Sequence, residues 1–244
     1  IRLNFALKNS IKSFLKLKIK VRNKIVADGI QDKNFDSTNV GIHLNAQDFN
    51  KILSEKESIC VDMRNHYESE IGHFIGAITP NVDSFKESLE FLAKNFKNES
   101  KNKKILLYCT GGIRCEKASA FLKNKGFKKV FQLDGGIINY ARQIKKTGNN
   151  NKFVGKNFVF DNRLSEKITD DIISNCHQCG TKSDQHSNCS NVACNILFIQ
   201  CKHCKNLYNG CCSIECQKTN SLSLQKQKSL RRGKKASKRI YKKI

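Results

Sequence analysis

Short apolar runs and helix-like periodicities alternate through the middle of the chain. Apolar residues recur at helical spacing in residues 84–96, 114–125 and 136–144, while runs typical of buried strands cover residues 58–61, 105–108 and 130–133. Gly126 follows the second helical stretch, where glycine suits the left-handed end of a helix. Because strands and helices alternate, we predict an α/β fold. It has a central parallel sheet, helices on both faces and a site at the carboxyl ends of the strands.

The strand predicted at residues 105–108 leads directly into Cys109, a glycine-rich turn and the start of a helix. In such an arrangement backbone N–H groups converge on one point and stabilise negative charge there. We therefore predict that Cys109 is catalytic, as a thiolate of lowered pKa and a persulfide carrier, rather than an inert core cysteine. Arg114 would hold an anionic ligand or the charge on sulfur. Four loop residues are the expected backbone donors: Thr110, Gly111, Gly112 and Ile113.

Three segments, in the right order, resemble hallmarks of the rhodanese-type sulfurtransferases. The first covers residues 61–77, the second is the Cys109 loop with arginine five residues after the cysteine, and the third covers residues 126–137. The resemblance spans roughly residues 40–145 and implies a rhodanese-like domain.

Four segments narrow this resemblance to one family, at residues 62–68, 109–120, 153–161 and 176–180. Together they resemble the rhodanese-related tRNA uridine hydroxylases, which use oxygen to install 5-hydroxyuridine at the tRNA wobble position. The resemblance runs from about residue 17 to 216 and implies an oxygen-dependent oxidoreductase with tRNA as its partner. Proteins of this family usually carry a complete small α/β domain first. Only its end is expected here, at residues 15–21, so we interpret the chain as a fragment or a reduced version.

Other residues near these motifs have less specific interpretations. Cys115 either resolves a persulfide or merely begins the helix. Asp62 and Arg64 resemble a structural pair that ties the first strand to its following loop, and a salt bridge is favoured over catalysis. His73 lies in a segment that is architectural in rhodaneses, and Cys60 in a buried strand is expected to be inert.

The charge of the chain favours a polyanionic partner. The net charge is +24, and residues 218–244 carry eleven Lys or Arg and no acid. Such a basic tail is typically disordered in isolation, and we expect it to contact RNA through counterion release, the alternative being a solvated tail without a partner. There is no apolar run of 18 or more residues, so no segment is expected to span a membrane. With tRNA as the implied partner, DNA is not expected to bind.

Nine of the twelve cysteines lie in residues 176–216. Two C-x-x-C pairs, Cys176/Cys179 and Cys201/Cys204, bracket a spacer of 21 residues, a spacing that favours a structural zinc site. The alternatives are reduced cysteines, another metal cluster or disulfides, but no signal peptide is visible and a cytoplasmic protein is expected. The remaining cysteines form a second site or replace some of these ligands: Cys189, Cys194, Cys211, Cys212 and Cys216.

These observations divide the chain into four parts. Residues 1–30 are the end of an N-terminal α/β domain with a linker, 31–150 the rhodanese-like domain, 151–217 a small Cys-rich, zinc-stabilised domain, and 218–244 the basic tail. Residues 152–160 combine three phenylalanines with two lysines, which fits either base stacking or a strand with one buried face.

Three functions remain open at this point. The first is hydroxylation of the wobble uridine with molecular oxygen, although no flavin, haem, pterin or facial-triad iron motif identifies a redox cofactor. The second is a rhodanese-type sulfurtransferase that carries a persulfide on Cys109. The third is a zinc- and RNA-binding protein without catalysis, against which the intact Cys109 and Arg114 count.

Overall fold

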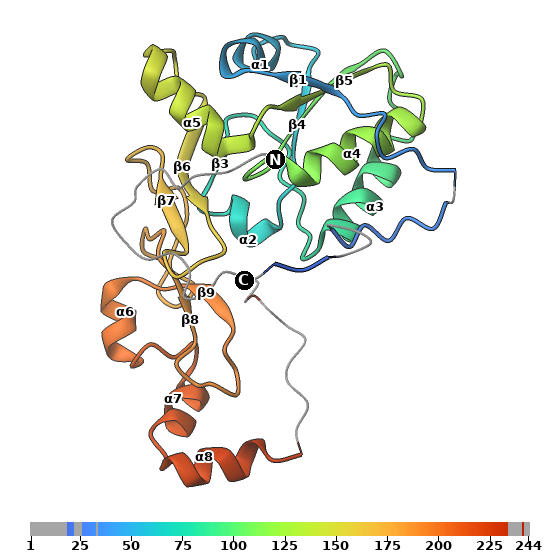
Figure 1. Ribbon diagram of the computed structural model, residues 1–244. Helices are drawn as coiled ribbons and strands as arrows, with labels where there is room; N and C mark the ends of the chain where they lie inside the picture. Colours follow the sequence, from blue (N-terminus) through green and yellow to red (C-terminus); the bar gives the residue numbers. More distant parts are fainter. Residues whose placement is uncertain (1–18, 22–25, 33, 234–240, 242–244) are drawn as a thin grey trace. The chain divides into compact units, whose positions relative to one another are not determined.

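The computed structural model describes residues 19–21, 26–32, 34–233 and 241 (Figure 1). The chain forms two compact units that divide between Asp170 and Asp171. Of the strand expected at residues 15–21, residues 15–18 lie outside the described part, and residues 19–21 have no regular secondary structure. Among the described residues, no helix is long and apolar enough to cross a bilayer.

The first unit is built on a parallel sheet of four strands in the order β1-β5-β4-β2. Three of these strands match the predicted ones, and the three-residue β1 was not predicted. Their bounds are β1 (Ile42–Leu44), β2 (Ile59–Asp62), β4 (Lys104–Tyr108) and β5 (Lys129–Leu133). The central strand β4 pairs with β2 on one side and with β5 on the other, so the predicted parallel sheet is confirmed.

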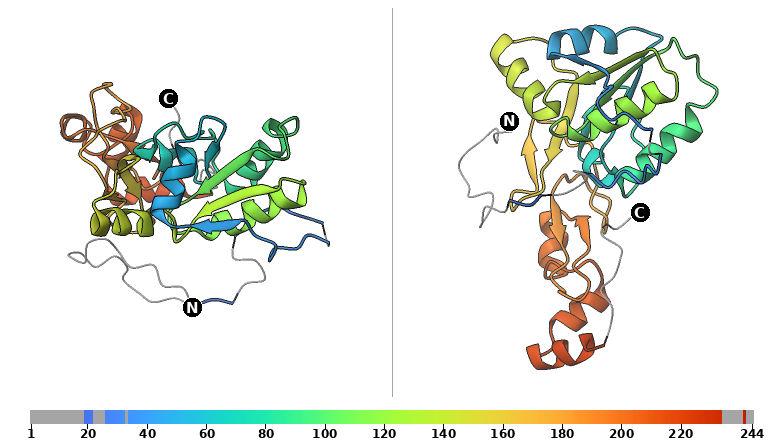
Figure 2. Two further views of the ribbon diagram at one scale, coloured as in Figure 1. Left: turned by 90° about the horizontal axis from the view of Figure 1, so that it is seen from above. Right: turned by 45° about the vertical axis from the view of Figure 1, so that its right-hand side comes forward.

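Helices cover both faces of this sheet, as Figures 1 and 2 show. One face carries α3 (Phe85–Asn95) and α4 (Ile113–Asn124), and the other carries α1 (Ala46–Leu53) and α5 (Gly136–Thr147). Successive side chains of β4 point to opposite faces, so Ile105 and Leu107 pack with α3 and α4 while Leu106 packs with α1 and α5. Burial of each such side chain contributes about 1.5–3 kcal/mol, which explains the continuous apolar run in this strand.

Gly126 ends α4 as predicted. Its φ is +89°, its N–H donates to the carbonyl of Lys123 at 2.9 Å, and the N–H of Phe127 donates to Leu122 at 3.1 Å. This pair of bonds satisfies carbonyls that the last helical turn leaves without an intrahelical partner. The turn therefore sends the chain directly into β5.

A second, antiparallel sheet extends the first unit beyond the predicted domain end at residue 150. It consists of β3 (Gly72–Phe74), which follows the short helix α2 (His66–Ser69), together with β6 (Phe153–Phe158) and β7 (Ser165–Lys167). Phe153 and Phe158 are buried, which favours the strand interpretation of residues 152–160, although Phe160 is 59% exposed. Because β6 pairs with β3, residues 153–167 belong to the first compact unit rather than to the Cys-rich one.

Glycine is required where β3 and β6 meet. A Cβ on Gly72 would lie 2.2 Å from the carbonyl oxygen of Lys156, and one on Gly155 would lie 2.2 Å from that of Ile71. Gly155 also has a φ of +85°, which disfavours other residues. Two glycines thus allow the close approach of these strands.

The second unit has little regular structure. It contains the hairpin of β8 (His186–Asn188) and β9 (Leu197–Ile199), then α6 (Lys202–Leu207), α7 (Ile214–Asn220) and α8 (Leu224–Arg231). Helix α8 lies in the tail for which disorder was expected, and the Ser223 side chain caps it by accepting from the N–H of Lys226 at 3.3 Å. Neither α7 nor α8 has a buried residue, so apolar packing holds these two helices only weakly.

Candidate active site and metal-binding cysteines

Cys109 lies directly after β4, at the carboxyl edge of the parallel sheet, and its side chain is only 2% exposed. The loop that follows turns sharply, with a φ of +91° at Gly112, before α4 begins. The N–H of Gly112 donates to Sγ of Cys109 at 3.1 Å, and the backbone N–H groups of Arg114 and Cys115 also bond this sulfur. Gly112 is one of the four predicted backbone donors, whereas Arg114 and Cys115 were expected to act in other ways.

These contacts lower the pKa of Cys109 from 9.0 to about 6. The largest cause is a hydrogen bond from the Cys115 side chain, which outweighs the opposing effect of burial, and the nearby Arg114 cation lowers the pKa further. Cys109 is therefore mainly a thiolate at neutral pH. Such a pKa fits a nucleophilic or sulfur-carrying residue rather than an inert core thiol.

Cys115 begins α4 and also participates in the site. It is completely buried, and its interaction with Cys109 is the largest cause of the lowered pKa of that residue. Burial, followed by the contact with Cys109, raises the pKa of Cys115 well above 9.0. Cys115 thus stays protonated as a donor while Cys109 is charged.

Arg114 is bound by a carboxylate. Its guanidinium donates to both carboxylate oxygens of Glu68 on α2, at 2.6 and 2.8 Å, and the two side chains are 14% and 0% exposed. The hydroxyl of Thr110 lies 3.4 Å from Glu68, which adds a weaker contact between α2 and the loop. Arg114 therefore acts on the sulfur through its charge, while its fork is committed to Glu68.

No role was predicted for Glu68 from the sequence, although this residue lies in the segment 62–68 that resembles the hydroxylase family. The only local signal is the capping box of α2, in which Glu68 accepts from the N–H of Asn65 at 3.0 Å. Its partner Arg114 is 46 residues away in sequence, so the ion pair becomes visible only in the fold.

Asp62 and Arg64 form the expected salt bridge beneath this site. Arg64 donates from Nη2 to Asp62 at 2.6 Å, both side chains are completely buried, and the same guanidinium donates to the carbonyl of Gly72 at 2.6 Å. The pair thus ties the end of β2 to β3. The ring of His73 contacts the carbonyl of Ser69 at 3.0 Å, a contact within the architecture of the α2–β3 segment.

Eight cysteines of the second unit form two groups of four that could each hold a metal ion. Within each group all sulfur atoms lie within 4.8 Å of one another, and none of the twelve cysteines, all of which are described, is in a disulfide. We call Cys176, Cys179, Cys201 and Cys204 the first quartet, and Cys189, Cys194, Cys212 and Cys216 the second quartet. The four cysteines of the first quartet therefore lie together, as the C-x-x-C spacing predicts.

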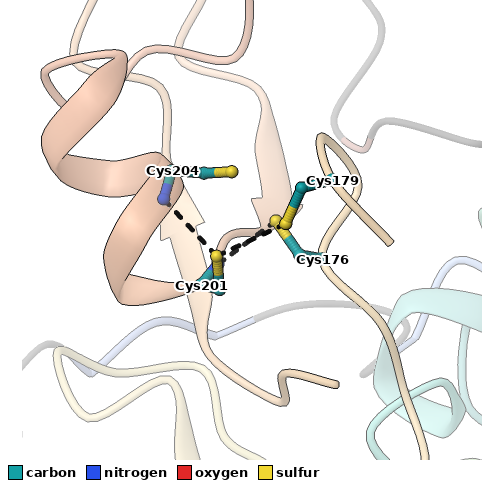
Figure 3. A group of neighbouring side chains, drawn as sticks. All are labelled: Cys176, Cys179, Cys201 and Cys204. Atoms are coloured by element: carbon teal, nitrogen blue, oxygen red, sulfur yellow. Dashed lines mark hydrogen bonds between the residues drawn. The ribbon is translucent and has the colours of Figure 1, made fainter. Parts of the chain in front are cut away.

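The first quartet joins a loop to the start of α6 (Figure 3). Cys176 and Cys179 come from the loop, Cys201 caps the helix, and Cys204 lies in its first turn. The sulfurs of Cys179 and Cys201 are 3.6 Å apart, and the N–H of Cys201 donates to Sγ of Cys176 at 3.3 Å. Four sulfurs that converge in this way match the donor set of a structural metal site.

Two family models match separate parts of the chain. Residues 45–143 match the family model of the rhodanese-like domain, and residues 154–217 match the model described as rhodanase C-terminal. Among solved structures, a rhodanese-like domain from Anabaena sp. is 22% identical, with a TM-score of 0.36, and the match covers 46% of this chain and 78% of that one.

Similarity to curated proteins covers nearly the whole chain. The protein from Leptospira interrogans is 54% identical over 98% of this chain, that from Sodalis glossinidius 51% over 100%, and that from Pectobacterium atrosepticum 49% over 100%. Each is named tRNA uridine(34) hydroxylase, and the chain spans 65%, 69% and 68% of their respective lengths. The chain therefore belongs to the family of the tRNA uridine(34) hydroxylases.

Proposed function

We propose that this protein hydroxylates the wobble uridine of tRNA to 5-hydroxyuridine, with molecular oxygen as co-substrate and Cys109 as the catalytic residue. The observation that carries the proposal is the identity of 49–54%, over 98–100% of the chain, to proteins named tRNA uridine(34) hydroxylase. On this proposal the protein is an oxygen-dependent oxidoreductase.

The chemistry of the Cys109 loop supports a reactive sulfur at the centre of this function. The thiolate is available at neutral pH because its pKa is about 6. Glu68 fixes the Arg114 side chain, and Arg114 in turn supplies positive charge beside the sulfur. Cys109 is thus the residue that contacts substrate or oxidant, whereas Arg114, Cys115 and Glu68 position it and set its charge.

The charge of the chain supports tRNA as the substrate. A net charge of +24 favours a phosphate backbone through counterion release, and α8 adds Lys226, Lys228 and Arg231 on a helix without buried residues. Phe160, at 59% exposure, is an aromatic side chain on which an unstacked base could stack.

Zinc fits the first quartet as a structural ion. The donor set consists of four cysteine sulfurs, and the unit around it has a small apolar core. A zinc ion there would join the loop of Cys176 to helix α6.

The test compares tRNA nucleosides, by mass spectrometry, from cells that lack the protein and carry wild type, Cys109→Ala or Cys60→Ala. Cys60 is the matched control, since it is also buried in the sheet but lies away from the loop. We expect 5-hydroxyuridine derivatives with wild type and Cys60→Ala and none with Cys109→Ala. Full modification with Cys109→Ala would remove Cys109 from the mechanism, and none with wild type would reject the hydroxylase.

A rhodanese-type sulfurtransferase is the second candidate, favoured by the depressed pKa of Cys109 within a six-residue loop. Its test is transfer of sulfur from thiosulfate to cyanide by the same purified variants. Cys109-dependent transfer together with unmodified tRNA in the complemented cells would favour this function over hydroxylation.

A further inference from the structure

The second quartet lacks the spacing that identified the first. Its members are separated by four residues in one pair, Cys189/Cys194, and by three in the other, Cys212/Cys216. We propose that this quartet binds a second structural zinc ion, so that the chain holds two, and that the two sites are interleaved along the sequence. The proposal is independent of the hydroxylase activity, because metal content is measured without tRNA.

The sulfur separations fit a single tetrahedral ion. A metal with four sulfur ligands at about 2.3 Å places the sulfurs about 3.8 Å apart. In the second quartet, Cys194 and Cys212 are 3.6 Å apart and Cys212 and Cys216 are 3.7 Å apart. An iron–sulfur cluster contains several irons between its cysteines and spreads them more widely, so a mononuclear ion fits better.

Local structure brings the unusual spacings together. The N–H groups of Cys194 and Asn195 both donate to the carbonyl of Asn191, at 2.9 and 2.8 Å, and this turn returns the chain beside Cys189. Asn195 has a φ of +43°, a conformation that asparagine tolerates better than most residues. On the other side, the hydroxyl of Ser213 caps α7 by accepting from the N–H of Cys216 at 3.2 Å.

The two quartets repeat the same backbone contact. The N–H of Cys201 donates to Sγ of Cys176 at 3.3 Å in the first quartet, and the N–H of Cys212 donates to Sγ of Cys189 at 3.4 Å in the second. In both, the second pair of cysteines adjoins the start of a short helix, α6 or α7. The repetition indicates two sites of one kind rather than one site with thiols packed nearby.

The order of the pairs along the chain interleaves the sites. The first and third pairs, Cys176/Cys179 and Cys201/Cys204, make the first quartet, while the second and fourth pairs make the second. The loop that either ion closes therefore contains half of the other site. When one ion is lost, the chain between the two cysteine pairs of the other site becomes a longer flexible loop, which costs more entropy to close. We therefore expect zinc at one site to strengthen zinc binding at the other.

The experiment measures zinc per chain by mass spectrometry in full-length wild type, Cys216→Ser and Cys211→Ser, purified under reducing conditions. Cys211 is the matched control, because it is buried in the same small core but lies outside the quartet. We expect two zinc ions in wild type and Cys211→Ser and at most one in Cys216→Ser. One zinc in wild type, iron in place of zinc, or two zinc ions in Cys216→Ser would overturn the second site.

The coupling is tested by the rate at which a chromogenic chelator removes zinc. If Cys216→Ser retains one zinc ion, we expect it to lose that ion faster than wild type loses the more slowly released of its two ions. If Cys216→Ser retains no zinc, binding at the first site depends completely on the second. Release of a single retained ion at the slowest wild-type rate would show that interleaving has no energetic consequence and would overturn that part of the proposal.

Discussion

The Cys109 loop and the two quartets place cysteine in opposite surroundings. Cys109 lies among backbone N–H donors, an arginine and one protonated thiol, above a large apolar core. Each quartet places its sulfurs beside one another, in a unit whose core is small. The first arrangement stabilises a single negative sulfur, whereas the second is the kind of donor set that a metal cation would hold together. Neighbouring groups, rather than the residue type, thus decide what a cysteine does.

Removal of metal should produce the largest difference between the two regions, in their protection against hydrogen exchange. With a chelator under reducing conditions, we expect the second unit to lose its protection against hydrogen exchange, since its apolar core alone is too small to keep it folded. The strands of the first unit should keep their protection. Equal protection of the second unit with and without chelator would show that its quartets need no metal for folding.

Removal of the carboxylate beside Arg114 should be the next largest effect. Glu68→Ala leaves a buried guanidinium without its partner, which we expect to cost about 3–5 kcal/mol in the free energy of unfolding. Urea denaturation measures the loss. Glu90→Ala is the control, because its ion pair with Lys86 is exposed, and it should change stability little. Equal losses in both variants would mean that the Glu68 pair contributes no more than a surface pair.

The smallest of these effects concerns the charge on Cys109. Cys115→Ala removes the largest cause of the lowered pKa, so the pKa of Cys109 should rise from about 6 toward 9.0, while Cys115→Ser keeps a donor and should shift it less. Ultraviolet thiolate absorbance, taken as the difference from the matching Cys109→Ala protein, follows this titration. An unchanged pKa in Cys115→Ala would assign the shift to the backbone donors and Arg114 instead.

The same titration predicts how stability depends on pH. The folded pKa of Cys109 lies below its usual value of 9.0, so its contribution to stability is complete above pH 9 and is lost as the pH falls through about 6. In Cys115→Ala this window should narrow, because the folded pKa moves closer to the unfolded one.

Sequence patterns were most informative where the signal is local. The run of apolar residues in β4, the following glycine turn and the Gly126 helix end are fixed by nearby residues, and all three were predicted. Strands β1 and β3 have three residues each, too few to show a periodicity. The ion pair of Arg114 and the pairing of β6 with β3 depend on contacts between residues distant in sequence. The same strand pairing extends the first compact unit to Asp170, beyond the domain end predicted at residue 150.

The cysteines show the same division. The two-residue gap within each C-x-x-C pair was enough to predict the members of the first quartet from the sequence. The second quartet has unequal gaps, and Cys211 and Cys212 are adjacent, so the sequence does not decide which of them faces the others. The structure places Cys212 in the second quartet and Cys211 in the small apolar core outside it.

The interleaved order of the cysteines also has a consequence for protein synthesis. The ribosome delivers Cys204 before Cys216, so the first quartet is complete while the second still lacks its last pair, Cys212/Cys216. If both quartets bind zinc as proposed, a nascent chain would complete the first site before the second, and the first ion would close the loop that carries Cys189 and Cys194. Truncation between Cys204 and Cys212 would leave two orphan thiolates, Cys189 and Cys194, inside a loop already closed, and such a product should be prone to oxidation and a substrate for quality-control proteases.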